Sequence, residues 1–226
     1  MRMLALFEKG ERLRHIGHLD IMRAMQRALR RSSLPVSYSK GFNPHILLGF
    51  ASAMPVGAVG KCELMEVELD SDVDAGEFEK RMNEALPEDL KVFSCRPLPP
   101  HGPALMAQVC AASWHLKILD DDLRRRVQES IPSFLEKDEI PAMKKTKSGE
   151  KEVNIRPMIL HLEAEEDGTL DMTLQMEESQ SCKPSMLLES LLRHNGIQDF
   201  SVRYALTRDH LLGRHHDTLC YLEDIA

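Results

Sequence analysis

The segment that sets the fold of the first half of the chain reads HLDIMRAMQRALRR and spans residues 18–31. At about 100° per residue, its apolar side chains fall within one arc and its arginines fall on the opposite side. The sequence therefore predicts a helix with one buried face and an exposed stripe of arginines. The apolar residues are Ile21, Met22, Met25, Ala28 and Leu29, and the arginine stripe consists of Arg23, Arg27, Arg30 and Arg31.

The segments around this helix predict a β-α-β-β-α-β order. Short apolar runs predict strands at 3–7, 36–39, 45–53, 62–69 and 90–95, where 36–39 and 45–53 are two parts of one interrupted strand. An amphipathic stretch at 74–86 predicts a second helix. This order is typical of the ferredoxin-like arrangement.

The same order is predicted again after a proline-rich boundary, because residues 96–103 hold four prolines. The downstream strands are predicted at 112–119, 155–163, 169–176 and 200–206, the helices at 121–135 and 184–193, and a flexible basic loop at 144–151. We therefore predict an α+β protein with two tandem ferredoxin-like (βαββαβ) domains. The first spans residues 1–96 and the second residues 111–226, joined by a linker at 97–110.

The charge is distributed unevenly along the chain. The whole sequence has 29 basic and 36 acidic residues, a net charge of −7. Residues 1–60 hold nine basic and three acidic groups, so this segment carries +6 and the remainder −13. Such asymmetry is expected where one face meets a polyanion, although a solvated basic helix would also explain it.

The arginine stripe is the main candidate for contact with phosphate groups. Arginine suits phosphates because its planar fork of donors matches their oxygens. The stripe has no acidic partner at i+4 and only Gln26 nearby. A solvated face or a surface for a protein partner are the alternatives. The candidate RNA- or phosphate-binding residues are Arg12, Arg14, His18, Arg23, Arg27, Arg30, Arg31, Lys40, Asn43 and His45.

Three histidines in the same region are candidates for catalysis or metal binding. His15, His18 and His45 lie near arginines, and histidine can act as general acid or base in RNA cleavage. His15 and His18 could also share a metal with Asp20 or His45. A structural or phosphate-contacting role is more typical of such residues. We therefore predict no catalytic residue, no metal and no cofactor.

Other features exclude several classes of protein. The five cysteines, Cys62, Cys95, Cys110, Cys182 and Cys220, have neither metal-ligand nor redox spacing, which predicts buried reduced thiols. The sequence has no phosphate-binding loop, no dinucleotide fingerprint, no nucleophile elbow and no zinc-protease motif. It also has neither a signal peptide nor a run long enough to span a membrane, so we predict a cytoplasmic protein.

Several motifs resemble the radical-SAM-linked family of bacterial proteins, whose function is not established. They are RHIGHLDIMR at 14–23, RALRR at 27–31, LPVSYSKGFNPH at 34–45, NIRP at 154–157, and the segment from Lys183 to Arg203. The resemblance implies a partner that is a radical-SAM enzyme. The chain lacks C-x-x-x-C-x-x-C and so resembles the linked module without an iron–sulfur domain. Gly17 and Ile46 depart from the family pattern, which has serine and proline there.

The combined features lead to one main hypothesis and two alternatives. The main hypothesis is an RNA-binding module that presents tRNA or ribosomal RNA to a radical-SAM modification enzyme. The first alternative is an adaptor that binds such an enzyme without RNA contact. The weaker alternative is a metal-independent endoribonuclease that uses His15, His18 or His45, by analogy of fold and charge with the nucleases that process CRISPR repeats.

Overall fold

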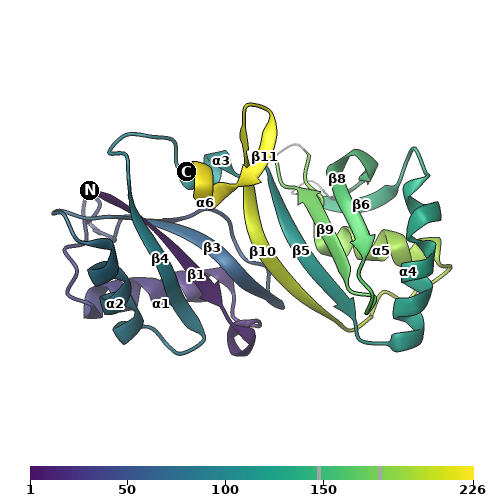
Figure 1. Ribbon diagram of the computed structural model, residues 1–226, viewed down its shortest axis with the longest axis horizontal. Helices are drawn as coiled ribbons and strands as arrows, with labels where there is room; N and C mark the ends of the chain where they lie inside the picture. Colours follow the sequence, from purple (N-terminus) through teal and green to yellow (C-terminus); the bar gives the residue numbers. More distant parts are fainter. Residues whose placement is uncertain (147–148, 178–179) are drawn as a thin grey trace. The chain divides into compact units, whose positions relative to one another are not determined.

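The computed structural model describes residues 1–146, 149–177 and 180–226, and it confirms a mixed α+β protein (Figure 1). The chain divides into two compact units. Unit 1 contains Met1–Val109 and Arg208–Ala226, and unit 2 contains Cys110–Thr207. The predicted boundaries placed residues 208–226 in the second domain, whereas the compact units group them with the beginning of the chain. Among the described residues, no helix has the length and apolarity that a membrane crossing requires.

Unit 1 begins with the predicted order of elements. They are β1 (Arg2–Lys9), a 3-10 turn η1 (Glu11–Leu13), α1 (His18–Arg31), β2 (Leu48–Phe50), β3 (Ala58–Glu68), α2 (Ala75–Ala85) and β4 (Leu90–Leu98). The strands pair antiparallel in the order β4-β1-β3-β2. The interrupted second strand is shorter than predicted. Residues 36–46 contribute only single bridges, from Val36 to Leu69 and from Tyr38 to Ile46.

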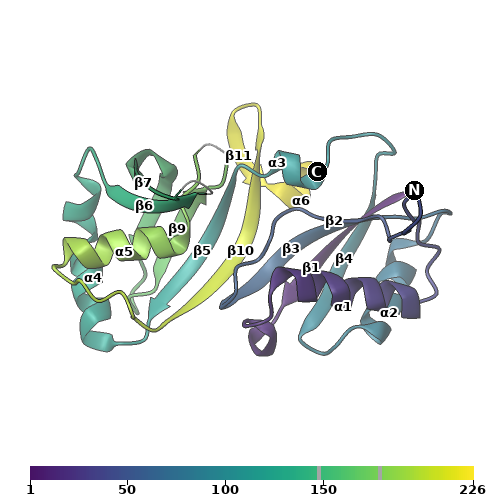
Figure 2. The ribbon, with the colours of Figure 1, turned by 180° about the vertical axis from the view of Figure 1, so that it is seen from behind.

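Helices α1 and α2 cover one face of this sheet (Figure 2). The apolar arc of α1 is buried as predicted at Ile21, Met25, Ala28 and Leu29, while Met22 is half-buried. These side chains pack in one cluster with Phe78 and Met82 of α2 and with alternate residues of β1, β3 and β4. The amphipathic pattern of residues 18–31 therefore fixes which way α1 faces.

The end of the chain completes unit 1. After the short helix α3 (Leu105–Gln108), the chain forms unit 2 and returns to unit 1 at Arg208, within β10 (Tyr204–His215). It ends with β11 (Thr218–Tyr221) and a last turn of helix, α6 (Leu222–Ile225). β10 starts later than the strand predicted at 200–206 and runs nine residues further. It turns back into β11, where Leu212 pairs with Tyr221. The Arg96 guanidinium donates hydrogen bonds to the Glu223 and Ala226 carbonyls, at 2.9 and 2.7 Å.

Unit 2 departs from the predicted order. Its elements are β5 (Ala111–Ile118), α4 (Asp121–Leu135), β6 (Pro141–Thr146), β7 (Gly149–Asn154), a 3-10 turn η2 (Arg156–Met158), β8 (Ile159–Ala164), β9 (Leu170–Gln175) and α5 (Pro184–His194). Strands β5, β9 and β8 form an antiparallel sheet in that order. The hairpin predicted across residues 166–168 is confirmed. Each predicted helix matches an observed one within a single residue.

The prediction of a flexible loop at residues 144–151 is wrong. β6 and β7 form an antiparallel hairpin in which Lys145 pairs with Glu150 and Lys144 with Lys151. The charged side chains hid these strands, because exposed strands that are held by backbone pairing need no apolar alternation. Of the two pairs, Lys145 and Glu150 carry opposite charges, whereas Lys144 and Lys151 carry like charges. Lys147 and Ser148, which belong to the predicted loop, lie outside the described residues.

The cysteines are all free thiols, but their burial differs from the prediction. Cys62, Cys110 and Cys182 are buried as predicted, whereas Cys95 and Cys220 are only half-buried. Burial raises the pKa of Cys95 to about 12, with a contribution from Glu79. Burial also raises the pKa of Cys182 to about 12. These two thiols therefore hold their protons at neutral pH.

We expect a thiol reagent at about pH 8 to modify Cys220 quickly and to spare Cys95 and Cys182. Only the thiolate form of cysteine reacts, and at that pH about one in 10⁴ of the Cys95 and Cys182 thiols is ionised. Timed labelling followed by peptide mass spectrometry measures the rates. Cys220→Ser should remove the fast phase. Fast labelling of Cys182 in the folded protein would contradict the expectation.

Candidate nucleic-acid interface

The arginine stripe of α1 lies on the protein surface. All four side chains are exposed. Arg23 forms an exposed ion pair with Asp20 at 2.9 Å, and Arg31 donates to the Ala85 carbonyl at 2.6 Å. The side chains of Arg27 and Arg30 make neither a hydrogen bond nor an ion pair with the part of the chain that the structure describes. Two of the four arginines therefore present their full set of donors to solvent.

The loop from Lys40 to His45 is a closed turn with an aromatic side chain exposed. Ser39 and His45 close its base through a backbone hydrogen bond of 2.8 Å and a contact of 2.8 Å between Ser39 Oγ and His45 Nδ1. Phe42 is fully exposed, and Gly41 has a φ of +129°, which favours glycine. Lys40 and Asn43 are exposed on the same turn. His45 therefore supports the loop, and Phe42 is a candidate that the sequence prediction missed.

The segment between β1 and α1 holds its arginines in ion pairs. Arg12 contacts Glu88 at 3.0 Å, and Arg14 pairs with Glu11. Arg14 also donates to His15 Nε2 at 3.0 Å. Exposed pairs of this kind contribute little free energy, so a phosphate group can compete for these guanidinium groups.

His18 is less suited to the roles predicted for it. It is half-buried and meets the ring of Phe50 edge-on, with 5.3 Å between ring centres. Loss of solvent lowers its pKa from 6.5, the charge of Arg208 lowers it further, and Glu63 opposes the shift. The ring is therefore neutral at neutral pH, which does not favour a phosphate-binding cation. Among the described residues, no third ligand joins His15 and His18.

A cluster of three buried charges lies inside unit 1. Arg208 and Glu63 form a bidentate ion pair, with 2.8 Å from Nε to Oε1 and 2.5 Å from Nη2 to Oε2. Lys9 is fully buried and donates to the carbonyls of Arg14 and Ala58, both at 3.1 Å. Burial lowers the pKa of Lys9, Glu63 raises it, and Arg208 lowers it. The sequence prediction missed this cluster because Arg208 lies far along the chain from its partner.

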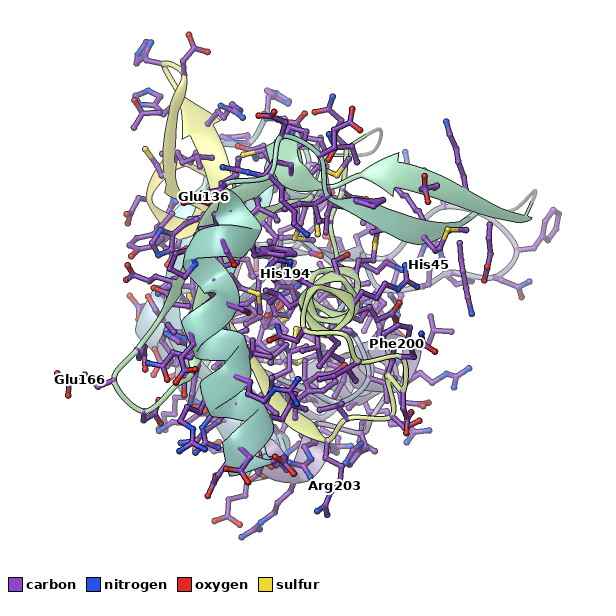
Figure 3. The ribbon with its side chains drawn as sticks, turned by 90° about the vertical axis from the view of Figure 1, so that its right-hand side faces the viewer. His45, Glu136, Glu166, His194, Phe200 and Arg203 are labelled. Atoms are coloured by element: carbon purple, nitrogen blue, oxygen red, sulfur yellow. The ribbon has the colours of Figure 1, made fainter. Side chains whose placement is uncertain are left out.

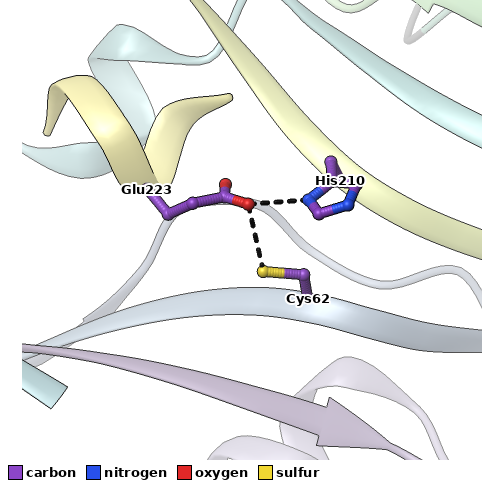
Figure 4. A group of neighbouring side chains, drawn as sticks. All are labelled: Cys62, His210 and Glu223. Atoms are coloured by element: carbon purple, nitrogen blue, oxygen red, sulfur yellow. Dashed lines mark hydrogen bonds and ion pairs between the residues drawn. The ribbon is translucent and has the colours of Figure 1, made fainter. Parts of the chain in front are cut away.

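A second group that the sequence prediction missed joins Cys62, His210 and Glu223 (Figure 4). Glu223 Oε1 lies 2.7 Å from His210 Nδ1 and 3.4 Å from Cys62 Sγ. Burial raises the pKa of the Cys62 thiol, and the Glu223 carboxylate raises it further. All three residues belong to unit 1, on β3, β10 and α6. Their wide separation along the chain left no spacing signal in the sequence.

Unit 2 contains a basic cleft of about 480 Å³ between the β6–β7 hairpin and α5. Arg193 lies over the ring of Phe200, 4.9 Å from its centre, and Phe200 is labelled beside α5 in Figure 3. The charged residues that line the cleft are Lys144, Lys145, Lys183, Arg193, Glu150 and Glu189. The sequence prediction missed this surface because Lys144 and Lys145 were assigned to a flexible loop, far along the chain from Lys183 and Arg193.

Comparison with known proteins identifies one family. A family model described as "Uncharacterized protein conserved in bacteria (DUF2344)" matches residues 2–184. No curated protein matches the sequence. The matched residues include the arginine stripe, the loop at 40–45 and the first residue of α5.

Proposed function

Because the chain belongs to DUF2344, a family of uncharacterised bacterial proteins, we propose a function from its surface chemistry. The chain is an RNA-binding accessory module that works with a radical-SAM enzyme in the modification or maturation of tRNA or ribosomal RNA. It has no catalytic activity of its own, and its role is to bind the RNA and to position it for the enzyme.

The observation that carries this proposal is the state of Arg27 and Arg30. Both side chains are exposed on α1, and neither has an acidic partner among the described residues. An acidic residue one turn away stabilises an exposed arginine on a helix, as Asp20 does for Arg23. Unmatched guanidinium groups in a row suit a ladder of phosphates along a nucleic-acid backbone.

The loop and the cleft support RNA over other polyanions. Phe42 offers an exposed ring beside Lys40, a combination that stacks a base while binding its phosphate. In unit 2, Arg193 and Phe200 pair a cation with a ring in the same way. Such aromatic contacts suit unpaired bases, which are common in the loops of structured RNA.

The proposed partner rests on the sequence motifs, and the finer fold rests on the order of the strands. The resemblance of residues 14–45 to the radical-SAM-linked family suggests a radical-SAM enzyme as partner. The order β4-β1-β3-β2 with α1 and α2 on one face supports a ferredoxin-like plan for the first half of the chain. The β5-β9-β8 sheet with α4 and α5 would be a second copy into which the β6–β7 hairpin is inserted.

The test is the salt dependence of RNA binding. Each phosphate contact contributes about −0.9 to the slope of log K against log salt on a duplex and about −0.7 on a single strand. For Arg27→Gln combined with Arg30→Gln, we expect the slope to become shallower by about 1.4 to 1.8. Thermal stability should barely change, because both side chains face solvent. Fluorescence anisotropy with labelled tRNA and ribosomal RNA fragments measures the slope.

A matched control removes the same charge elsewhere. Arg125 and Arg126 are exposed on α4, where Arg125 pairs with Asp122. Arg125→Gln combined with Arg126→Gln should leave the slope unchanged. If both double variants change the salt slope equally, the arginine stripe contributes only through the net charge of the protein and not as a specific phosphate-binding surface. An intact protein without RNA affinity at low salt would end the RNA proposal and favour the adaptor.

A further inference from the structure

Three side chains with metal-binding chemistry converge in unit 1, where the strands and the last helical turn meet. Cys62 on β3, His210 on β10 and Glu223 on α6 each point one ligand atom toward the others (Figure 4). These sulfur, nitrogen and oxygen atoms all lie within 4.8 Å of one another. Cys62 is buried, and the other two residues are partly buried. The group is therefore shielded but reachable.

We propose that Cys62, His210 and Glu223 bind one zinc ion, with a fourth position left for water or another ligand. Zinc takes thiolate, imidazole and carboxylate ligands, and three protein ligands with one open position are common. Ligand atoms on a tetrahedral zinc are about 3.5 Å apart for bond lengths of about 2.0–2.3 Å. The observed 2.7 Å and 3.4 Å to Glu223 Oε1 need only small side-chain shifts to reach that spacing.

The second oxygen of Glu223 gives an independent reason to expect a cation. Glu223 Oε2 is buried and has no hydrogen-bond partner in the described part of the chain. A buried carboxylate oxygen without a partner is costly, and such atoms often mark an ion that belongs at the site. The contacts of Oε1 are with a thiol and an imidazole, and neither carries a fixed positive charge. A divalent cation would supply the missing charge.

The surroundings hold the ligands in position. Arg96 fixes α6 by donating to the carbonyls of Glu223 and Ala226. Tyr221 stacks on the imidazole of His210, with 4.2 Å between ring centres and 30° between planes. Partners that orient ligands in this way accompany most metal sites in proteins.

The same geometry does not support a nucleophilic cysteine. Glu223 lies between the other two groups and accepts a hydrogen bond from each, so the hydrogen-bond partner of the Cys62 thiol is a carboxylate and not the imidazole base that would have to deprotonate it. With zinc, the Cys62 S–H bond breaks, a Zn–S bond forms, and the proton is released to solvent. This inference departs from the sequence-based expectation of no metal, which considered only ligands spaced closely along the chain.

The experiment is a titration of the untagged, metal-free full-length protein with Co²⁺ as a spectroscopic substitute, followed by displacement with Zn²⁺. We expect one equivalent to bind and to give a thiolate-to-cobalt charge-transfer band that zinc removes. Cys62→Ser should abolish that band. Glu223→Gln, which keeps the shape of the side chain, should weaken zinc binding by at least about 10-fold. Cys182→Ser is the matched control, a buried thiol in unit 2, and should change nothing.

Two outcomes would overturn the proposal. One is wild-type protein that binds less than one equivalent or gives no charge-transfer band. The other is a Glu223→Gln variant that melts like the wild type and keeps its zinc affinity. If Cys62→Ser fails to fold, the Glu223→Gln titration decides. The metal should also raise the melting temperature of the wild type and not that of Glu223→Gln, because binding to the folded state alone is stabilising.

Discussion

Replacing Glu63 by glutamine is expected to lower the free energy of unfolding by about 3–5 kcal/mol. Glu63 is the buried partner of Arg208, and Lys9 is buried beside them. Without the carboxylate, the buried cations Arg208 and Lys9 lose the acidic group that pairs with one and offsets the charge of the other. Urea denaturation followed by circular dichroism measures the change.

The loss should depend on pH in a defined direction. The pKa of Lys9 in the folded protein already lies below 10.5, and Glu63 is the group that raises it. The variant lowers that pKa further, so folded Lys9 releases its proton at a pH where unfolded Lys9 still holds one. Stability of the variant should therefore recover as the pH rises toward 10.5. Stability losses that stay constant over that range would contradict this account.

An exposed pair provides the control. Glu88 pairs with Arg12 on the surface, where both side chains are largely exposed. Glu88→Gln should change the free energy of unfolding by less than about 1 kcal/mol, because solvent screens such pairs. A Glu63→Gln variant that loses no more than this would show that the buried pair is not needed for folding.

Replacing Met25 by alanine is the second large effect, with an expected loss of about 2–5 kcal/mol. Met25 is fully buried in the apolar arc of α1, within the cluster that α1 and α2 form on the sheet. The change removes apolar contacts and leaves a cavity that the surrounding strands cannot fill. Chemical denaturation gives the free energy directly.

Met106 is the matched control for Met25. It lies on α3 in the same unit and is 66% exposed, so Met106→Ala should stay within about 0.5 kcal/mol. The folded fraction of Met25→Ala should keep the salt slope of wild-type RNA binding, because the arginine stripe is on the opposite side of α1. A loss of unfolding free energy for Met25→Ala as small as that for Met106→Ala would show that Met25 is not part of the hydrophobic core.

The helices were the part of the fold that the sequence predicted well. α1, α4 and α5 each have apolar residues at helical spacing, and each follows or precedes a clear boundary such as Pro184. Local chemistry was sufficient there, because amphipathic periodicity reports the buried face of a helix. The exposure of Arg27 and Arg30 follows from the same pattern.

The remaining features depend on contacts between distant segments. No sequence pattern near Glu63 predicts its ion pair with Arg208, and none near Cys62 predicts its contact with His210 or Glu223. The half of the β6–β7 hairpin nearest its turn is charged, from Lys144 and Lys145 to Glu150, Lys151 and Glu152, so this part lacks the apolar alternation by which strands are recognised. The orientation of Phe42 was also hidden, because composition does not say which aromatic residue a loop exposes.

The path of the chain has a consequence for synthesis on the ribosome. The chain leaves unit 1 at Val109 and returns at Arg208, so unit 2 is an insertion within unit 1. Glu63 emerges 145 residues before its partner, a delay of roughly 7 to 30 s at the usual rates of translation. During that interval the nascent first unit holds the Glu63 carboxylate and the Lys9 ammonium without Arg208. The core of unit 1 is therefore completed only after all of unit 2 has been synthesised.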